Sequence, residues 1–219
     1  MNILELFSGT ESFSKVARER GHKTITIDWD IKFNPDILID ILDIPEEIDS
    51  FFGEKFDIIW ASPPCTEYSQ AKSQGKRDIK YANKIVLKTL KIIKKLNHKF
   101  WIIENPQTGL LKNQSFMKKL PYIDVSYCKY GLPYKKQTRL WTNLKFNGKI
   151  CKKDCEFMIN TNKGKRHIGS AGCGGKGQGH KIRYSNKSYK TIEKYGIPKI
   201  LCLQIIKQCE ENEIQRNKN

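Results

Sequence analysis

The segment NILELFSGTESFSKVARERGHKTITID, residues 2–28, decides the fold class of this 219-residue chain. Its apolar run at residues 3–7 predicts a buried strand that enters a turn at Gly9. Residues 12–20 then predict a helix closed by Gly21, and the β-branched run 23–28 predicts a second strand. A strand, a crossover helix and a second strand make one βαβ unit, the building block of α/β folds.

The same alternation continues along the chain. Further strands are expected at residues 37–39, 56–60 and 100–103, and further helices near 45–53, at 78–97 and at 198–211. This order predicts an α/β fold of the Rossmann-like kind, with a mostly parallel central sheet and helices on both faces. Ligands bind such sheets at the carboxyl ends of the strands. The sequence places five candidate residues there: Gly9, Asp28, Asp40, Cys65 and Glu104.

Charge is divided unevenly and points to a polyanionic partner. Residues 1–70 hold 6 basic and 14 acidic side chains, whereas residues 71–219 hold 34 and 9. The run 157–192 has no acidic residue, 8 Lys or Arg and 7 Gly, so it predicts a basic loop that closes on a nucleic-acid backbone. We expect a single domain over 1–219, with a small basic, glycine-rich lobe at about 145–185.

Membrane and secreted proteins are not expected from this sequence. No apolar run approaches the roughly 18 residues of a membrane span. The first residues, MNILELFSG, lack the basic region of a secretory signal. Seven cysteines without such a signal predict reduced thiols. We therefore expect a cytoplasmic protein, or one acting inside a host cell.

The first strand ends favour an adenosine-type ligand. Gly9 alone fits an ordinary strand–helix turn, but Asp28 suits ribose hydroxyls and Trp29 suits an adenine face. Asp40 would accept a hydrogen bond from an exocyclic amine. Together these residues describe an adenosine-type ligand without requiring a pyrophosphate-binding loop, and S-adenosylmethionine fits better than NAD.

The stretch ASPPCTEYSQ, residues 61–70, presents a thiol at a stiff strand exit. A free cysteine is most often a buried structural thiol. Here Pro63 and Pro64 fix the backbone and aim Cys65 away from the strand. Glu104, followed by Asn105 and Pro106 at the next strand exit, is a candidate proton donor to its substrate.

Four motifs, LFSGTESF, ASPPCTEYS, WIIENP and KKQTRLW, resemble in order and spacing those of the C5-cytosine DNA methyltransferases. The resemblance covers residues 2–143, with a weaker match at YGIPKILCLQII, and is greatest to compact forms from phages and large viruses. It implies methyl transfer from S-adenosylmethionine to C5 of a cytosine flipped out of double-stranded DNA, with Cys65 bonded to C6. Glu104 would act at N3, and Arg139 would hold the base or orient Glu104. The implied cofactor residues are Phe7, Gly9, Asp28, Trp29, Asp40 and Pro64.

The chain departs from the family pattern at several points. Glu11 stands where a second glycine is usual, and Trp141 replaces a second arginine. Only about 45 residues separate RLWTN from the last helix, so recognition is either short and loose or supplied by a partner protein. Two other functions stay open: a nucleic-acid-binding accessory module without turnover, and a cytosine-C5 methyltransferase of tRNA.

A second constellation has the composition of a metal site. Cys151 and Cys155, which have three residues between them, match a structural Cys3His zinc site together with Cys128 and His167. Cys173 and His180 are substitutes in the same region. The alternative is four ordinary side chains in a reducing compartment.

Overall fold

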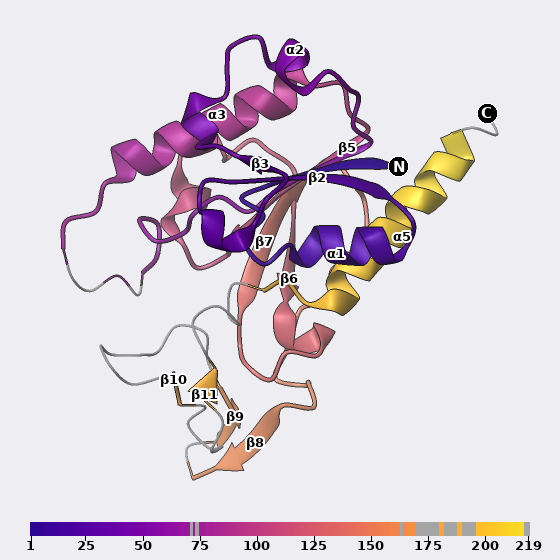
Figure 1. Ribbon diagram of the computed structural model, residues 1–219. Coiled ribbons are helices and arrows are strands. Elements are labelled where there is room, and N and C mark those ends of the chain that lie inside the picture. The colour runs from indigo at the N-terminus through magenta and orange to yellow at the C-terminus, as the bar shows by residue number, and fades with distance from the viewer. Residues whose placement is uncertain are drawn as a thin grey trace.

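A seven-stranded sheet forms the centre of the molecule, with the strand order β3-β2-β1-β4-β5-β7-β6 (Figure 1). The strands are β1 (Asn2–Leu6), β2 (Lys23–Asp28), β3 (Ile37–Leu38), β4 (Ile58–Ala61), β5 (Phe100–Pro106), β6 (Tyr122–Ser126) and β7 (Gln137–Thr142). The first five in sequence are parallel, whereas β7 runs antiparallel to both β5 and β6. The predicted α/β class and mostly parallel sheet are confirmed; the antiparallel strand inserted beside β5 was not anticipated.

This computed structural model describes residues 1–70, 72, 75–162, 164–169 and 196–216, and the backbone of two further short strands. Those two strands are β10 (His180–Lys181) and β11 (Ser188–Tyr189). Most of the basic segment 157–192 therefore lies outside the described residues, as do Lys163, Cys173 and the side chain of His180.

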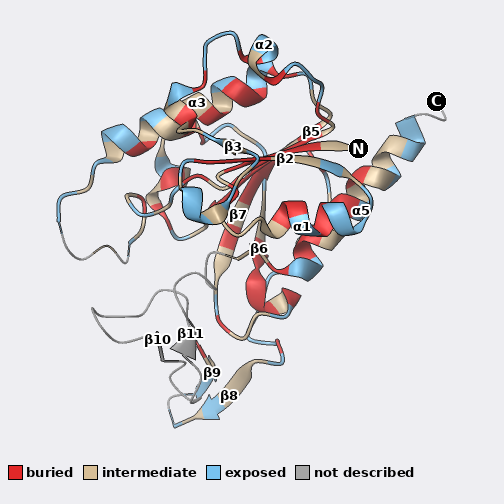
Figure 2. Cartoon of the chain, in the orientation of Figure 1, coloured by how far each residue is buried: buried red, intermediate tan, exposed pale blue. Residues whose placement is uncertain are grey.

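Helices cover both faces of the sheet (Figure 1). The α-helices are α1 (Ser12–Glu19), α2 (Ile48–Phe52), α3 (Ile79–Lys95) and α5 (Lys199–Arg216), and the 3-10 helices are η1 (Ile31–Phe33), η2 (Ile41–Asp43), η3 (Leu110–Asn113) and η4 (Tyr127–Tyr130). One apolar core lies under α2 and α3, and the other lies under α1 and α5. Figure 2 shows the strands buried between them. In the described ranges, no helix is long and apolar enough to cross a bilayer.

The segment after β7 returns along the outer edge of β6. Ser126 donates its backbone N–H to the Lys149 carbonyl at 2.9 Å, and Cys151 donates its own to Ser126 Oγ at 3.0 Å. Gly148 is required in this segment, because a Cβ there would lie 2.6 Å from Ile123 Cγ2. The chain thereby reaches the ribbon of β8 (Met158–Thr161) and β9 (Gly164–His167), which Figure 1 shows beyond the ends of β6 and β7.

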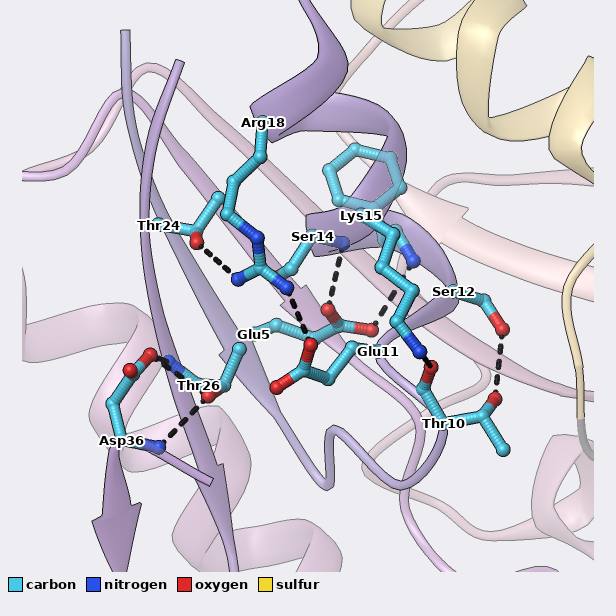
Figure 3. A network of polar contacts seen from close by, with 11 residues as sticks. Glu5, Thr10, Glu11, Ser12, Ser14, Lys15, Arg18, Thr24, Thr26 and Asp36 are labelled. Atoms are coloured by element: carbon cyan, nitrogen blue, oxygen red, sulfur yellow. Dashed lines mark hydrogen bonds and ion pairs between the residues drawn. The ribbon is translucent and has the colours of Figure 1, made fainter. Parts of the chain in front are cut away.

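A buried carboxylate caps the first long helix. Glu5 in β1 is 2% exposed and accepts the backbone N–H of Ser14 at 2.8 Å and that of Phe13 at 3.4 Å (Figure 3). These donors belong to the first turn of α1, where backbone N–H groups have no partner within the helix. Glu5 thus fixes the helix relative to the strand that precedes it.

Burial of Glu5 makes stability depend on pH. Burial raises the pKa of Glu5 from 4.5 to about 7, although the N–H groups of Ser14 and Phe13 oppose the shift. The unfolded chain loses this proton near pH 4.5 and the folded chain near pH 7, so this group's contribution to stability falls as pH rises between those values. Glu5→Gln removes the titration. We expect the unfolding free energy of the variant, measured relative to that of wild type, to be higher at pH 8 than at pH 5 by up to about 3 kcal/mol.

Urea denaturation of wild type and Glu5→Gln at both pH values measures this difference. Glu19→Gln, an exposed carboxamide substitution on the same helix, is the matched control and should show no such trend. A pH-independent difference for Glu5→Gln would contradict the assignment.

Candidate active site

A cavity of about 340 Å³ opens at the carboxyl ends of β1, β2, β3 and β4. Five of the six predicted cofactor residues line it, namely Phe7, Asp28, Trp29, Asp40 and Pro64. The cavity also takes in Thr66, Glu67 and the first turns of α3 at Tyr81 and Ile85, which the sequence did not indicate. Apolar runs in the sequence predict where the strands end. The position of α3 against the cavity depends on tertiary packing, which the sequence does not specify.

The glycine turn between β1 and α1 has unusual backbone conformations. Phe7, Gly9 and Glu11 all have positive φ, at 59°, 46° and 55°. Glu11, which stands at the position where the family usually has glycine, therefore keeps the left-handed conformation that glycine adopts without strain. Gly9 is not among the lining residues, but its N–H donates to Asp28 Oδ2 at 2.9 Å. The turn is thus tied to the end of β2.

The two candidate carboxylates at the rim keep acceptor capacity for a ligand. Asp28 accepts the N–H of Gly9 on one oxygen and that of Asp30 on the other, at 2.9 and 3.0 Å. Asp40 caps η2 by accepting the N–H of Leu42 at 2.9 Å. A carboxylate has about four acceptor sites, so these bonds orient both groups without saturating them. Trp29 is 67% exposed and lines the same cavity.

Cys65 lies directly beyond β4, between the lining residues Pro64 and Thr66. The exit is held by Asn105, whose side chain donates to the Pro63 carbonyl at 2.9 Å. This bond joins the two stiff strand exits that the sequence singled out. Burial and the Glu104 carboxylate raise the pKa of the Cys65 thiol above its ordinary value, while the Lys136 ammonium lowers it.

Glu104 is 7% exposed near the end of β5 and has two described partners. Tyr127 of η4 donates its hydroxyl to Glu104 Oε1 at 2.8 Å, and Lys136 Nζ lies 3.7 Å from the same oxygen. Burial, followed by the Glu104 charge, raises the pKa of Tyr127 well above its ordinary value, so this hydroxyl remains a donor. Neither partner was anticipated from the sequence.

The resemblance implies that Arg139 holds the base or orients Glu104, and the structure does not bring Arg139 to Glu104. Glu104 pairs in register with Leu140, whereas Arg139 pairs with Asn105 and Asp124. Because neighbouring residues of a strand point to opposite faces, Arg139 faces away from Glu104. Its guanidinium forms two hydrogen bonds to Asp124, at 2.7 and 2.8 Å, and lies over the Tyr122 ring. Lys136 occupies the position beside Glu104 instead.

Lys136 should set the pH dependence of this site. Replacing it with Met removes the cation that lowers the Cys65 pKa, so the thiolate should form only at higher pH. In an activity assay we expect Lys136→Met to lose rate at neutral pH and to recover part of it only at higher pH than wild type, because its thiol pKa is raised further. Exposed Lys135, replaced in the same way, is the control. A uniform loss with an unchanged pH profile would show that Lys136 acts only on the structure.

The predicted metal residues also come together, outside the cavity. Ligand atoms of Cys128, Cys151, Cys155 and His167 all lie within 4.8 Å of one another. Cys151 Sγ is 3.3 Å from His167 Nε2. These residues come from η4, from the segment that follows β6's outer edge, and from β9.

Comparison with known proteins identifies the family of this chain. A family model described as C-5 cytosine-specific DNA methylase matches residues 1–123. A protein of Frog virus 3 named "Probable DNA (cytosine-5)-methyltransferase" is 31% identical over 95% of this chain and 100% of its own length. Both findings confirm the resemblance seen in the four motifs.

Two solved structures share the fold. A methyltransferase of Entamoeba histolytica, EhMeth, aligns over 97% of this chain and 98% of its own, with a TM-score of 0.58 and 13% identity. A candidate DNA modification methyltransferase encoded within an E. coli prophage aligns over 67% of this chain and 49% of its own, with a TM-score of 0.52 and 21% identity. The motifs, the paired strand exits and the match to residues 1–123 together show that the chain belongs to the family of C-5 cytosine-specific DNA methylases.

Proposed function

We propose that this chain transfers a methyl group from S-adenosylmethionine to C5 of cytosine in DNA, through a covalent bond between Cys65 and C6. One observation supports this most directly. The thiol of Cys65 and the carboxylate of Glu104 stand at neighbouring strand exits, bridged by Asn105, beside the cavity at the sheet edge.

The cavity fits S-adenosylmethionine in size and chemistry. Its volume of about 340 Å³ is within the usual range for small-molecule sites, about 300–1,000 Å³. Asp28 and Asp40 offer oriented acceptors at its rim, and the apolar side chains Ile27, Ile39 and Ile41 line it. We assign the ribose to Asp28, an exocyclic amine to Asp40 and the adenine face to Trp29. When bound, this cofactor supplies an electrophilic methyl group.

The chain's own residues carry the remaining chemistry. Cys65 thiolate attacks C6 of the cytosine, while Glu104 hydrogen-bonds at N3 and supplies a proton there, which leaves C5 nucleophilic. Once C5 carries the methyl group, water takes the C5 proton, Cys65 leaves C6 as a thiolate and the N3 proton returns to Glu104, which restores the cytosine ring. Tyr127 and Lys136 hold the Glu104 carboxylate throughout.

The substrate is double-stranded DNA with the target cytosine flipped out of the helix, because neither C6 nor N3 can be reached within the stack. The excess of basic residues after position 70 suits a phosphate backbone. All six cysteines in the described ranges are free, which fits a reducing compartment inside a cell. A zinc ion at Cys128, Cys151, Cys155 and His167 would be structural, since none of them lines the cavity.

Methyl-labelled S-adenosylmethionine, incubated with the purified chain and either duplex DNA or tRNA, tests the proposal. We expect label in DNA, at 5-methylcytosine after hydrolysis. Label in tRNA alone would make the chain a tRNA methyltransferase. Binding of DNA without any label in either substrate would indicate an accessory module.

A further inference from the structure

The Cys–His cluster offers four metal ligands, and three separate segments of the chain meet there. Its three sulfurs and one imidazole come from three segments that are separate in sequence: Cys128, the pair Cys151 and Cys155, and His167. A tetrahedral zinc ion with Zn–S bonds of about 2.3 Å needs sulfurs about 3.8 Å apart. Mutual distances within 4.8 Å need only a small contraction to reach that geometry.

The local backbone is shaped like a metal-binding turn. Lys153, between the two cysteines, has a left-handed φ of 65°. Lys152 N–H in turn donates to Asp154 Oδ1 at 2.9 Å. This left-handed non-glycine residue turns the chain between Cys151 and Cys155, so that both sulfurs reach the same cluster. All four ligands come from this chain, so the site is closed and structural in type.

The same cluster is attached to both groups that hold Glu104. Cys128 directly follows Tyr127, whose hydroxyl bonds Glu104. The Tyr127 N–H donates to the Lys136 carbonyl at 3.0 Å, so η4 and the start of β7 are joined. Lys135 N–H donates to the carbonyl of Gly169, two residues beyond His167, also at 3.0 Å. Metal binding would therefore fix η4 from one side and the Lys135–Lys136 segment from the other.

We propose that Cys128, Cys151, Cys155 and His167 bind one zinc ion, and that this ion holds Tyr127 and Lys136 in place against Glu104. The metal is thus a positioning element and touches neither cytosine nor cofactor. Thiolate and imidazole ligands favour zinc over the hard cations Mg²⁺ and Ca²⁺. The metal half of the proposal stands by itself, while the positioning half rests on the proposed methyl transfer.

Metal content tests the first half without DNA or cofactor. Protein purified under reducing conditions without chelator should contain about one zinc per chain by elemental analysis. After exchange, cobalt(II) should give the visible bands of a tetrahedral site and thiolate charge-transfer bands. His167→Ala should lose the metal, whereas His167→Cys, which restores a four-ligand set, should keep it. Cys65→Ser should keep zinc in full. Absence of metal together with absence of a cobalt spectrum, or a disulfide within the cluster in the native protein, would overturn the site.

Single-turnover kinetics test the second half. A misplacement of about 1 Å at a catalytic group can cost about 100-fold in rate. Wild-type protein stripped of zinc by a chelator should transfer methyl roughly 10- to 100-fold more slowly, with unchanged affinity for S-adenosylmethionine by calorimetry. Added zinc should restore the rate. Chelation avoids reliance on His167→Ala if that variant does not fold. A stripped protein with the wild-type rate would overturn the positioning role, whereas a zinc-loaded wild type without any methyl transfer would overturn the proposed function and leave the metal site standing.

Discussion

Cys65→Ser is expected to abolish methyl transfer while cofactor and DNA binding persist. Serine at this position has the shape of cysteine, but its hydroxyl is not ionised near neutral pH and an alkoxide is a poor leaving group. Loss of a nucleophile in other enzymes costs about 10,000-fold or more, and we expect a loss of that order here. Transfer of label to duplex DNA measures the rate, and calorimetry with S-adenosylmethionine reports on the cavity.

DNA that contains 5-fluorocytosine gives a second readout of the same residue. Fluorine at C5 cannot be removed as a proton is, so the bond between the protein and C6 should persist through denaturing electrophoresis. Wild type should be trapped in a cofactor-dependent manner, and Cys65→Ser should not be. Cys209→Ala, a thiol removed from the core between α1 and α5, should still be trapped. A Cys65→Ser variant with full activity would rule out the covalent mechanism.

Glu104→Gln is expected to slow transfer by about 100- to 10,000-fold, the usual contribution of a general acid. The amide is nearly the same size and still reaches Tyr127, but it cannot deliver a proton to N3. Single-turnover rates at saturating cofactor measure the chemical step, and fluorescence anisotropy with labelled duplex checks that DNA affinity is kept.

Tyr127→Phe is the companion variant, because it removes one hydrogen bond from Glu104 and leaves the carboxyl group. We expect its loss to be smaller than that of Glu104→Gln. If Glu104→Gln costs less than about tenfold, Glu104 positions the base and does not protonate it.

The parts of the site that the sequence revealed are those fixed locally. Cys65 and Glu104 follow apolar runs that predict buried strands, and parallel strands place such ends at one edge. Tyr127 and Lys136 were not recognised, because they reach Glu104 only through the antiparallel insertion of β7 between β5 and β6. Nothing in a single sequence specifies that pairing.

Arg139 shows how one step of strand register changes a prediction. Its motif was visible, but the face on which it lies depends on which residue of β5 it opposes. The members of the metal cluster could be predicted from the sequence because their selection does not depend on strand register. Cys151 and Cys155 are neighbours in sequence, so their pairing needed no knowledge of the sheet, and Cys128 and His167 were selected by chemistry alone.

The path of the chain after β7 has a consequence for how this enzyme can diversify. The polypeptide leaves the core at Cys151, tied to Ser126, and rejoins it at Ile197, whose N–H donates to Ser12 Oγ at 3.2 Å. Between these two anchors the chain also contacts the core, because Lys135 N–H donates to the Gly169 carbonyl at 3.0 Å. An insertion between Cys151 and Gly169 would move Cys155 or His167 away from the other two members of the Cys–His cluster. A change of length between Gly169 and Ile197 would instead leave that cluster, both anchors and the sheet that carries Cys65 and Glu104 in place.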